Sequence, residues 1–209
     1  RHPEAYIRAI VTRGSGPILL DPATAGRPRR VVIVAPFTPH DAALYESGVS
    51  VHLVASGRSD TGITAGAKSG NYLVNVLALG AAKRRGAHEA ILLDHRGFLT
   101  EGASSNLFLV RDGGLETPPL TAGILEGITR QQVFALARDA GVAVTERPLE
   151  PQDLRRADEV FLTSTLREVL PVREVVDAEG DAYLLGDGGP GPLTRRLLSA
   201  YRRAAGVLD

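Results

Sequence analysis

The chain has 209 residues, of which 44% are hydrophobic and 23% charged, and its 24 basic residues balance its 24 acidic ones. This is the composition of a soluble globular protein with enough chain for one large domain or two small ones. A net charge of zero provides no basic field for non-specific binding to nucleic acid. No apolar run approaches the roughly 18 residues of a membrane span. We therefore expect neither nucleic acid nor a membrane as a partner.

The chain contains no Cys and no Met. The lack of Cys excludes disulfides and thiolate chemistry, and it fits a reducing, cytoplasmic compartment. The lack of an initiator Met leads us to expect that the numbering begins inside a longer native chain.

The first third of the sequence predicts three strands. Residues 5–13 are rich in β-branched side chains, and 29–35 form a continuous apolar run that predicts a strand buried on both faces. The segment 36–46 contains two prolines and no clear period, which is typical of a linker. A third strand is predicted over 49–55, followed by a loop over 57–70 rich in Gly, Ser and Thr.

A helix is predicted over 71–85, because apolar and small residues recur at helical spacing. The expected face consists of Leu73, Val76, Leu77, Gly80 and Ala81. Few of the strands alternate with helices, which favours a mixed α+β domain over a doubly wound sheet. The remaining expected elements are a hairpin over 90–101, helices over 129–140 and 193–203, and strands over 106–110, 142–147, 159–163 and 172–176.

Only two of the 24 basic residues are lysines, Lys68 and Lys83. Lys83 stands at a charged helix end, where we expect it to be solvated. Lys68 lies among small residues, and no acidic residue follows it until Glu89. An amine could be desolvated there, which would favour its neutral, nucleophilic form. The alternative is an ordinary surface lysine in an arginine-rich chain.

Three other segments carry groups suited to catalysis or anion binding. Glu101 ends a strand and is followed by small residues up to Asn106. Gly127 precedes a helix whose first turn carries Thr129, and a helix start attracts anions. Thr163, Ser164 and Thr165 place three hydroxyls at a strand end. The alternatives are that Glu101 is a solvated turn residue, that Thr129 is only an N-cap, and that the hydroxyl run satisfies backbone groups.

In this order, the segments resemble the class IV aminotransferases, the fold-type IV pyridoxal phosphate enzymes. That family includes branched-chain aminotransferase, D-amino acid aminotransferase and aminodeoxychorismate lyase. The resemblance is carried by Lys68, by 101–106 and 127–130, and by 157–161 with Thr165. It implies an α+β fold with a small N-terminal α/β domain, partly missing here, and a larger C-terminal pseudo-barrel domain. The implied boundaries are 1–38 for the remainder of the small domain, 39–48 for the linker and 49–209 for the cofactor-binding domain.

The resemblance also implies roles for individual residues. Lys68 matches the catalytic lysine that forms a Schiff base with pyridoxal 5'-phosphate and then moves a proton. Glu101 matches the carboxylate that pairs with the pyridine nitrogen. Ile128 and Thr129 match the helix start that binds the phosphate, and Thr165 matches a hydroxyl that completes this site. The family's phosphate-binding arginine would lie upstream of the residues present here.

Two arginines are candidates for the substrate carboxylate. Arg8 lies where branched-chain aminotransferases have an arginine, and Arg13 matches the carboxylate-binding arginine of the D-amino acid enzymes and the lyase. An odd spacing places the two on opposite sides of a regular strand, so both can reach one pocket only across a bulge. We favour Arg13, which stands beside a Gly turn, and leave a structural role to Arg8.

Two other residues near the hydroxyl run are candidates for substrate contact, namely Leu166 and Arg167. The Arg167 guanidinium could bind a second carboxylate, or it could pair with Glu168 or Glu174 at the surface. Tyr72 follows Lys68 at four residues rather than the five of the branched-chain enzymes, so a role at the cofactor is not carried over to it.

The expected function is that of a pyridoxal phosphate-dependent aminotransferase, acting on a branched-chain-like amino acid and a 2-oxo acid through Lys68. The alternative is aminodeoxychorismate lyase, which eliminates pyruvate with the same residues. A cofactor-less scaffold of the same fold is a more remote alternative. The resemblance further implies a homodimer, and no metal is expected.

Overall fold

The computed structural model describes residues 4–58 and 66–207. The chain divides into two compact units, residues 1–40 and residues 41–209.

The first unit is an antiparallel pair of strands, β1 (Ala5–Thr12) and β2 (Arg29–Pro36). Their register runs without a shift from Ala5 opposite Pro36 to Thr12 opposite Arg29. The connection contains the short 3-10 helix η1 (Pro22–Thr24), which is capped by the Asp21 carboxylate accepting a bond of 2.9 Å from the Ala23 N–H.

The expectation that the strand over 29–35 is buried on both faces is wrong for the chain described. Val32 and Val34 are 63% and 66% exposed, and Ile7 of the partner strand is 65% exposed. The reason is that β1 and β2 pair with each other, and no further described element of the first unit covers either face of this ribbon. The apolar run therefore forms a strand without forming a core.

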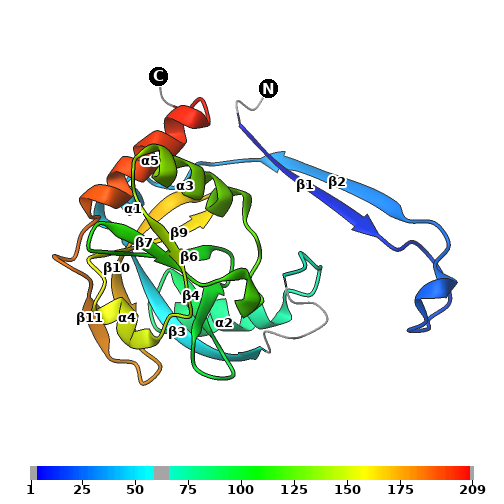
Figure 1. The fold of residues 1–209 in the computed structure, drawn as a ribbon. Coiled ribbons are helices and arrows are strands. Elements are labelled where there is room, and N and C mark those ends of the chain that lie inside the picture. The colour runs from blue at the N-terminus through cyan, green and yellow to red at the C-terminus, as the bar shows by residue number, and fades with distance from the viewer. Residues whose placement is uncertain (1–3, 59–65, 208–209) are drawn as a thin grey trace. The chain divides into compact units, whose positions relative to one another are not determined.

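The second unit is built on a nine-stranded mixed sheet (Figure 1). Its order is β5-β4-β3-β10-β9-β6-β7-β8, with β11 pairing with β10. The pairs β3–β4, β3–β10 and β7–β8 are parallel, and the others are antiparallel. The strands are β3 (Val49–Arg58), β4 (Glu89–Asp94), β5 (Leu99–Gly102), β6 (Asn106–Arg111), β7 (Gly114–Thr117), β8 (Val144–Glu146), β9 (Glu159–Ser164), β10 (Glu168–Val176) and β11 (Ala182–Leu184).

The sheet curls so that one face encloses the main hydrophobic core. Leu53, Ile91 and Leu162 lie in this core, and a bridge between Leu99 and Leu149 helps to close it. Alternate residues of the same strands face outward, where helices cover them. The helices of this unit are α1 (Ala43–Ser47), α2 (Leu73–Arg84), α3 (Ile128–Asp139), α4 (Pro151–Arg155) and α5 (Pro192–Ala204), with a 3-10 turn η2 (Leu120–Ala122).

Helices α3 and α5 pack on the outer face of the sheet over β6 and β9. Phe108 and Phe161 stack there with ring centroids 5.0 Å apart, and Phe134 of α3 meets Phe108 edge-on at 6.0 Å. Val133 and Leu197 complete this second core and are both fully buried. This packing fixes the start of α3 beside the ends of β6 and β9.

Helix α2 lies against the outer face of β3 and β4, but not through the residues that the sequence indicated. Ala78 and Ala82 are its buried residues. Leu73, Val76 and Leu77, expected on the buried face, are 64%, 62% and 63% exposed. The small alanine side chains let the helix approach the sheet, so tertiary packing rather than hydrophobicity selects its buried face.

Most of the other expected elements are confirmed, including the β4–β5 hairpin and the helices over 129–140 and 193–203. The segment 39–48, expected to be linker, contains α1. The strand expected over 172–176 begins earlier, at Glu168, and β8 is shorter than expected. The strands β7 and β11, the helix α4 and the 3-10 helices η1 and η2 were not predicted. Within the described ranges, no helix has the length and apolar character that crossing a membrane requires.

Candidate active site

The segment 123–127, which leads into α3, joins the parts of the chain that carry the candidate residues. The Gly66 N–H donates to the Gly123 carbonyl at 3.2 Å, which ties the Lys68 loop to this segment. The Leu125 N–H donates to Oε2 of Glu101 at 3.0 Å. The Leu125 carbonyl accepts a bond of 2.8 Å from Nδ2 of Asn106. One short segment therefore holds together the Lys68 loop, Glu101 and the start of β6.

Lys68 lies two residues beyond Gly66, in the stretch that leads to α2. The residue is exposed, so the described part of the chain does not provide the desolvation that the sequence suggested. Residues 59–65, which belong to the same expected loop, lie outside the described residues. Lys83 occupies the exposed last turn of α2, as expected.

Glu101 lies on β5 and is only 8% exposed. Its interpretation as a solvated turn residue is therefore wrong. A buried carboxylate requires hydrogen-bond or charge partners, and the Leu125 N–H provides one of them. The site thus contains a buried carboxyl group held in place by a backbone N–H, which is a group suited to pairing with a positive charge on a bound molecule.

Helix α3 begins at Ile128, with Gly127 as its N-cap and no side-chain cap. The interpretation of Thr129 as an N-cap is wrong, because Thr129 lies inside the first turn and is 2% exposed, whereas Ile128 is 70% exposed. The first N–H groups of a helix have no intrahelical acceptor and carry the positive end of its dipole. A Cβ on Gly127 would lie 2.2 Å from Oδ1 of Asn106, so this approach requires glycine.

Thr165 lies in the turn 165–167 that connects β9 and β10. Asn106 pairs directly with Thr163 across β6 and β9, which places both side chains on the face covered by α3. Thr165 and Leu166 are exposed. The hydroxyl of Ser164 accepts a bond of 3.3 Å from the Arg167 N–H, so this member of the hydroxyl run does serve the backbone.

Two buried hydroxyls at this place lack a hydrogen-bond partner among the described residues. They are Oγ1 of Thr163, whose residue is 1% exposed, and Oγ of Ser105, whose residue is 8% exposed. Buried polar atoms are rarely left unpaired without a reason, such as an unfilled ligand site. They flank Asn106, next to the segment that starts α3.

Arg167 pairs with neither Glu168 nor Glu174. Its Nη1 contacts Oε2 of Glu89, which is fully buried, and the Arg167 side chain is 17% exposed. Glu168 pairs with Arg202 instead, at 2.7 Å. The alternative of a surface pair with Glu168 or Glu174 is therefore wrong. Sequence reasoning missed Glu89 as a partner, although an acidic residue directly before the apolar run 90–93 could have indicated a buried charge.

Arg8 and Arg13 belong to the first unit. Arg8 lies on β1 opposite Ile33, and Arg13 follows the last residue of that strand. The unbroken register contains no bulge that would turn Arg8 and Arg13 to the same side. In the second unit, Tyr72 is the 39% exposed N-cap residue of α2.

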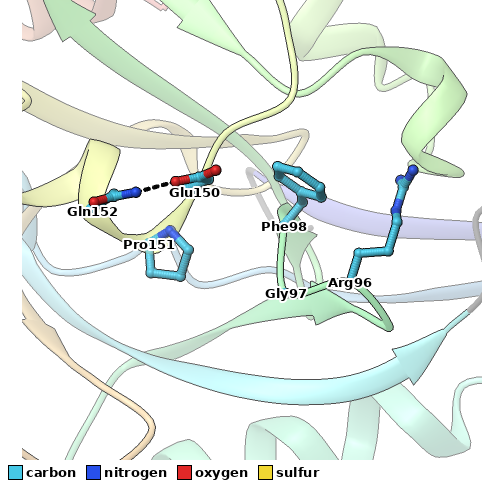
Figure 2. Close-up of a pocket in the computed structure, with 6 residues that line it drawn as sticks. All are labelled: Arg96, Gly97, Phe98, Glu150, Pro151 and Gln152. Carbon is cyan, nitrogen blue, oxygen red and sulfur yellow. Dashed lines mark hydrogen bonds between the residues drawn. The ribbon is translucent and has the colours of Figure 1, made fainter.

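A separate hollow of about 320 Å³ lies between the β4–β5 turn and the start of α4 (Figure 2). Figure 2 shows Phe98 and Glu150 side by side, and Gln152 donates to the Glu150 carboxylate. None of the candidate residues lines it; the lining consists of Arg96, Gly97, Phe98, Glu150, Pro151 and Gln152. Among the residues described, no group of three His, Asp or Glu could hold a metal ion.

Comparison with known families and proteins identifies the family of the chain. Residues 1–175 match the family described as amino-transferase class IV. The chain belongs to the class IV aminotransferase family. It is 38% identical over 201 residues to the branched-chain-amino-acid aminotransferase of Escherichia coli K12, covering 94% of this chain and 63% of that protein.

Other relatives support the same assignment. The D-alanine aminotransferase of Bacillus licheniformis is 39% identical over 137 residues, covering 66% of this chain and 46% of that protein. The structure of the branched-chain amino acid aminotransferase of Thermoproteus uzoniensis with norvaline superposes with a TM-score of 0.85 and 33% identity, covering 98% of this chain and 66% of that one. The chain thus has the fold-type IV architecture that the sequence predicted, and it spans about two thirds of the length of the branched-chain relatives.

Proposed function

We propose that the protein is a pyridoxal phosphate-dependent aminotransferase that transfers an amino group between a branched-chain-like amino acid and a 2-oxo acid. The observation that carries this proposal is the convergence of the Lys68 loop, Glu101 and Asn106 on the segment that starts α3. The names of the relatives support it, because branched-chain aminotransferases are 35–40% identical over most of the chain.

The residues present fit pyridoxal 5'-phosphate. The first turn of α3, at Ile128 and Thr129, offers N–H donors that have no acceptor within the helix. Thr165 offers an exposed hydroxyl two residues beyond Thr163, which pairs with Asn106 across β6 and β9. The buried Glu101 carboxylate would face a protonated pyridine nitrogen. The hydroxyls of Ser105 and Thr163, which lack a hydrogen-bond partner among the described residues, support a ligand site at this place. A related branched-chain amino acid aminotransferase with a TM-score of 0.88 to this chain has been solved with pyridoxamine 5'-phosphate.

Lys68 would be the catalytic residue. When bound, the cofactor supplies an electron sink for the substrate α-carbon. The Lys68 amine would bind the cofactor covalently at rest and would move the proton to and from the substrate α-carbon during turnover. Glu101 would keep the pyridine nitrogen protonated, and the α3 N–H groups and Thr165 would hold the phosphate in place. The exposure of Lys68 leaves its amine accessible for this exchange.

For the substrate, we propose that Arg13 binds the carboxylate and that Arg8 has the lesser role. Leu166 is 40% exposed beside Thr165 and would provide an apolar contact for a branched side chain. We further propose the boundaries 1–38, 39–48 and 49–209 for the small domain, linker and cofactor-binding domain. A cytoplasmic homodimer is part of the same proposal.

The aminotransferase is favoured over aminodeoxychorismate lyase, because the relatives are named branched-chain and D-alanine aminotransferases. The test is to incubate the protein with pyridoxal 5'-phosphate, 2-oxoglutarate and either L-leucine or D-alanine, and to measure glutamate. We expect glutamate from L-leucine. Pyruvate from aminodeoxychorismate without any glutamate would favour the lyase, and no spectral change on adding the cofactor would favour the scaffold.

A matched pair of lysine variants makes this test specific. Lys68→Ala should abolish glutamate formation, whereas Lys83→Ala should not, because Lys83 lies at the exposed end of α2. Full turnover by the Lys68→Ala variant would contradict the proposed role of Lys68.

A further inference from the structure

The carboxylate of Glu89 connects two turns that lie far apart in the sequence. Glu89 begins β4 and is 0% exposed. Its Oε1 accepts a bond of 3.0 Å from the Ala90 N–H. Its Oε2 accepts a bond of 2.8 Å from Oγ of Ser104 and also contacts Nη1 of Arg167, which is 78 residues away in the chain. A single buried oxygen therefore joins Ser104 and Arg167.

Both turns belong to the candidate site. Ser104 lies between Glu101 and Asn106, in a turn closed by a 2.7 Å bond from the Gly102 N–H to the Ser105 carbonyl. Arg167 ends the turn 165–167, which carries Thr165. The Glu89 carboxylate thus contacts both the β5–β6 connection, which follows Glu101, and the β9–β10 turn, which carries Thr165.

The turn 165–167 is held at further points around Arg167. The Tyr45 hydroxyl donates to the Arg167 carbonyl at 3.4 Å. Glu168 adopts a φ of 55°, a strained value for a residue other than glycine, and Arg202 binds its carboxylate at 2.7 Å. The Arg202 guanidinium lies 4.6 Å from the centre of the Tyr45 ring. These contacts hold the backbone at Arg167 and the neighbouring residue Glu168, while Leu166 remains 40% exposed.

We propose that Glu89 is a positioning residue that fixes the position of both turns of the site. It holds one turn through Ser104 and the other through Arg167. As a consequence, Arg167 is withheld from the substrate and does not bind a second carboxylate. This proposal rests on the proposed function in one respect only, namely the identity of the ligands that the two turns bind. Its physical basis is that a fully buried carboxylate cannot lose its charged partner without a large penalty, so a dicarboxylic substrate cannot readily compete for Arg167.

The first test measures hydrogen–deuterium exchange of backbone amides in the cofactor-free full chain. Glu89→Gln should speed exchange about tenfold or more in both turns, 102–105 and 165–168, because local opening becomes easier. Ser104→Ala should affect only the first turn, whereas Arg167→Ala should speed exchange most in the second turn, because it also leaves the buried Glu89 carboxylate without its charged partner. Glu179→Gln, at an exposed loop residue, is the matched control and should leave both turns unchanged.

Unchanged exchange in either turn of a folded Glu89→Gln variant would overturn the proposal. If that variant does not fold, the double variant Glu89→Gln/Arg167→Ala removes both charges, and it should fold and show fast exchange in both turns. A double variant with wild-type exchange in either turn would equally overturn the proposal. The exchange result does not depend on cofactor, so it decides the role of Glu89 even if the proposed function fails.

The second test asks what Arg167 binds. In titrations followed by absorbance, Glu89→Gln and Arg167→Ala should each weaken pyridoxal 5'-phosphate binding by about tenfold. The reason is that the turn 165–167, which carries Thr165, loses the contact between Glu89 and Arg167. The kcat/KM of Arg167→Ala for leucine and for glutamate should fall by similar factors. A rise of KM confined to glutamate and 2-oxoglutarate, with leucine unaffected, would show that Arg167 binds the second carboxylate and would contradict the proposal.

Discussion

Leu125 donates its backbone N–H to Oε2 of Glu101 at 3.0 Å, across 24 residues of sequence. The same residue accepts from Asn106 through its carbonyl, at 2.8 Å. The segment 123–127 therefore holds the buried carboxylate through a backbone N–H, and this bond does not depend on which side chain stands at position 125. The proposed pyridine partner and the proposed phosphate-binding helix start are held as one unit.

Glu101→Gln separates the charge of this residue from its structural bond. The amide oxygen can still accept from the Leu125 N–H, so we expect the melting temperature to change little. Turnover should fall on the order of a hundredfold, because a neutral amide does not stabilise a protonated pyridine nitrogen. Glu126→Gln, at an exposed position near α3, is the control. Wild-type turnover in Glu101→Gln would mean that its charge is not used.

Gly127→Ala tests the close approach at the start of α3. The added Cβ would lie 2.2 Å from Oδ1 of Asn106. We expect Asn106 to be displaced from Leu125, with a loss of about 1–3 kcal/mol in the free energy of unfolding and weaker binding of pyridoxal 5'-phosphate. Gly26→Ala, where a Cβ would meet no atom within 4 Å, is the matched control. Unchanged denaturation and cofactor titrations would contradict the role given to this glycine.

Arg13→Ala tests the proposed carboxylate site. Loss of a hydrogen-bonded charge partner costs about 1.5–3 kcal/mol, so KM for L-leucine should rise about tenfold to a hundredfold. Arg8→Ala should have a smaller effect, because β1 runs without a bulge that could turn both side chains to one side. Steady-state kinetics of the two variants decide between them. The reverse order of effects would assign the carboxylate to Arg8.

Asp153 links acid stability to a charge network remote from the candidate site. Burial would raise the pKa of Asp153, but hydrogen bonds from Arg147, the Glu150 N–H and Arg111 outweigh it and hold that pKa below its usual value. Because the folded-state pKa is depressed, this stabilisation is present above the unfolded pKa of about 4 and is lost as pH falls further.

Asp153→Asn should therefore lower the free energy of unfolding at pH 7 by about 3 kcal/mol. The difference from wild type should shrink as pH falls below about 4. Denaturant titrations across pH measure it. Asp139→Asn is the control, since Asp139 is 71% exposed and lies 3.8 Å from Arg138. A difference for Asp153→Asn that does not depend on pH would show that charge is not its cause.

The sequence predicted the fold where local pattern and tertiary packing agree, as in α3 and the β4–β5 hairpin. It did not predict which face of α2 is buried, because Ala78 and Ala82 pack closely while Leu73 and Leu77 remain exposed. The helix period alone cannot show which of two apolar faces meets a sheet. The exposed strand β2 shows in the same way that an apolar run predicts a strand without showing what covers it.

The candidate site was predicted through its resemblance to a family, and the residues that hold it in place were not. Glu89 lies fifteen residues from Ser104 and 78 from Arg167, and no local spacing relates these three. Thr129 resembled a cap in sequence, but the backbone places the cap at Gly127. Contacts between distant segments depend on strand order, which a single sequence does not specify.

The most direct test of the account is to identify the lysine that carries the cofactor. The protein would be loaded with pyridoxal 5'-phosphate, reduced with borohydride to make any C=N bond permanent, and digested for mass spectrometry. With only two lysines in the chain, Lys68 and Lys83, the result is unambiguous. We expect a pyridoxyl group on Lys68 alone. Labelling of Lys83 with Lys68 unmodified, or of neither lysine, would contradict the proposed role of Lys68.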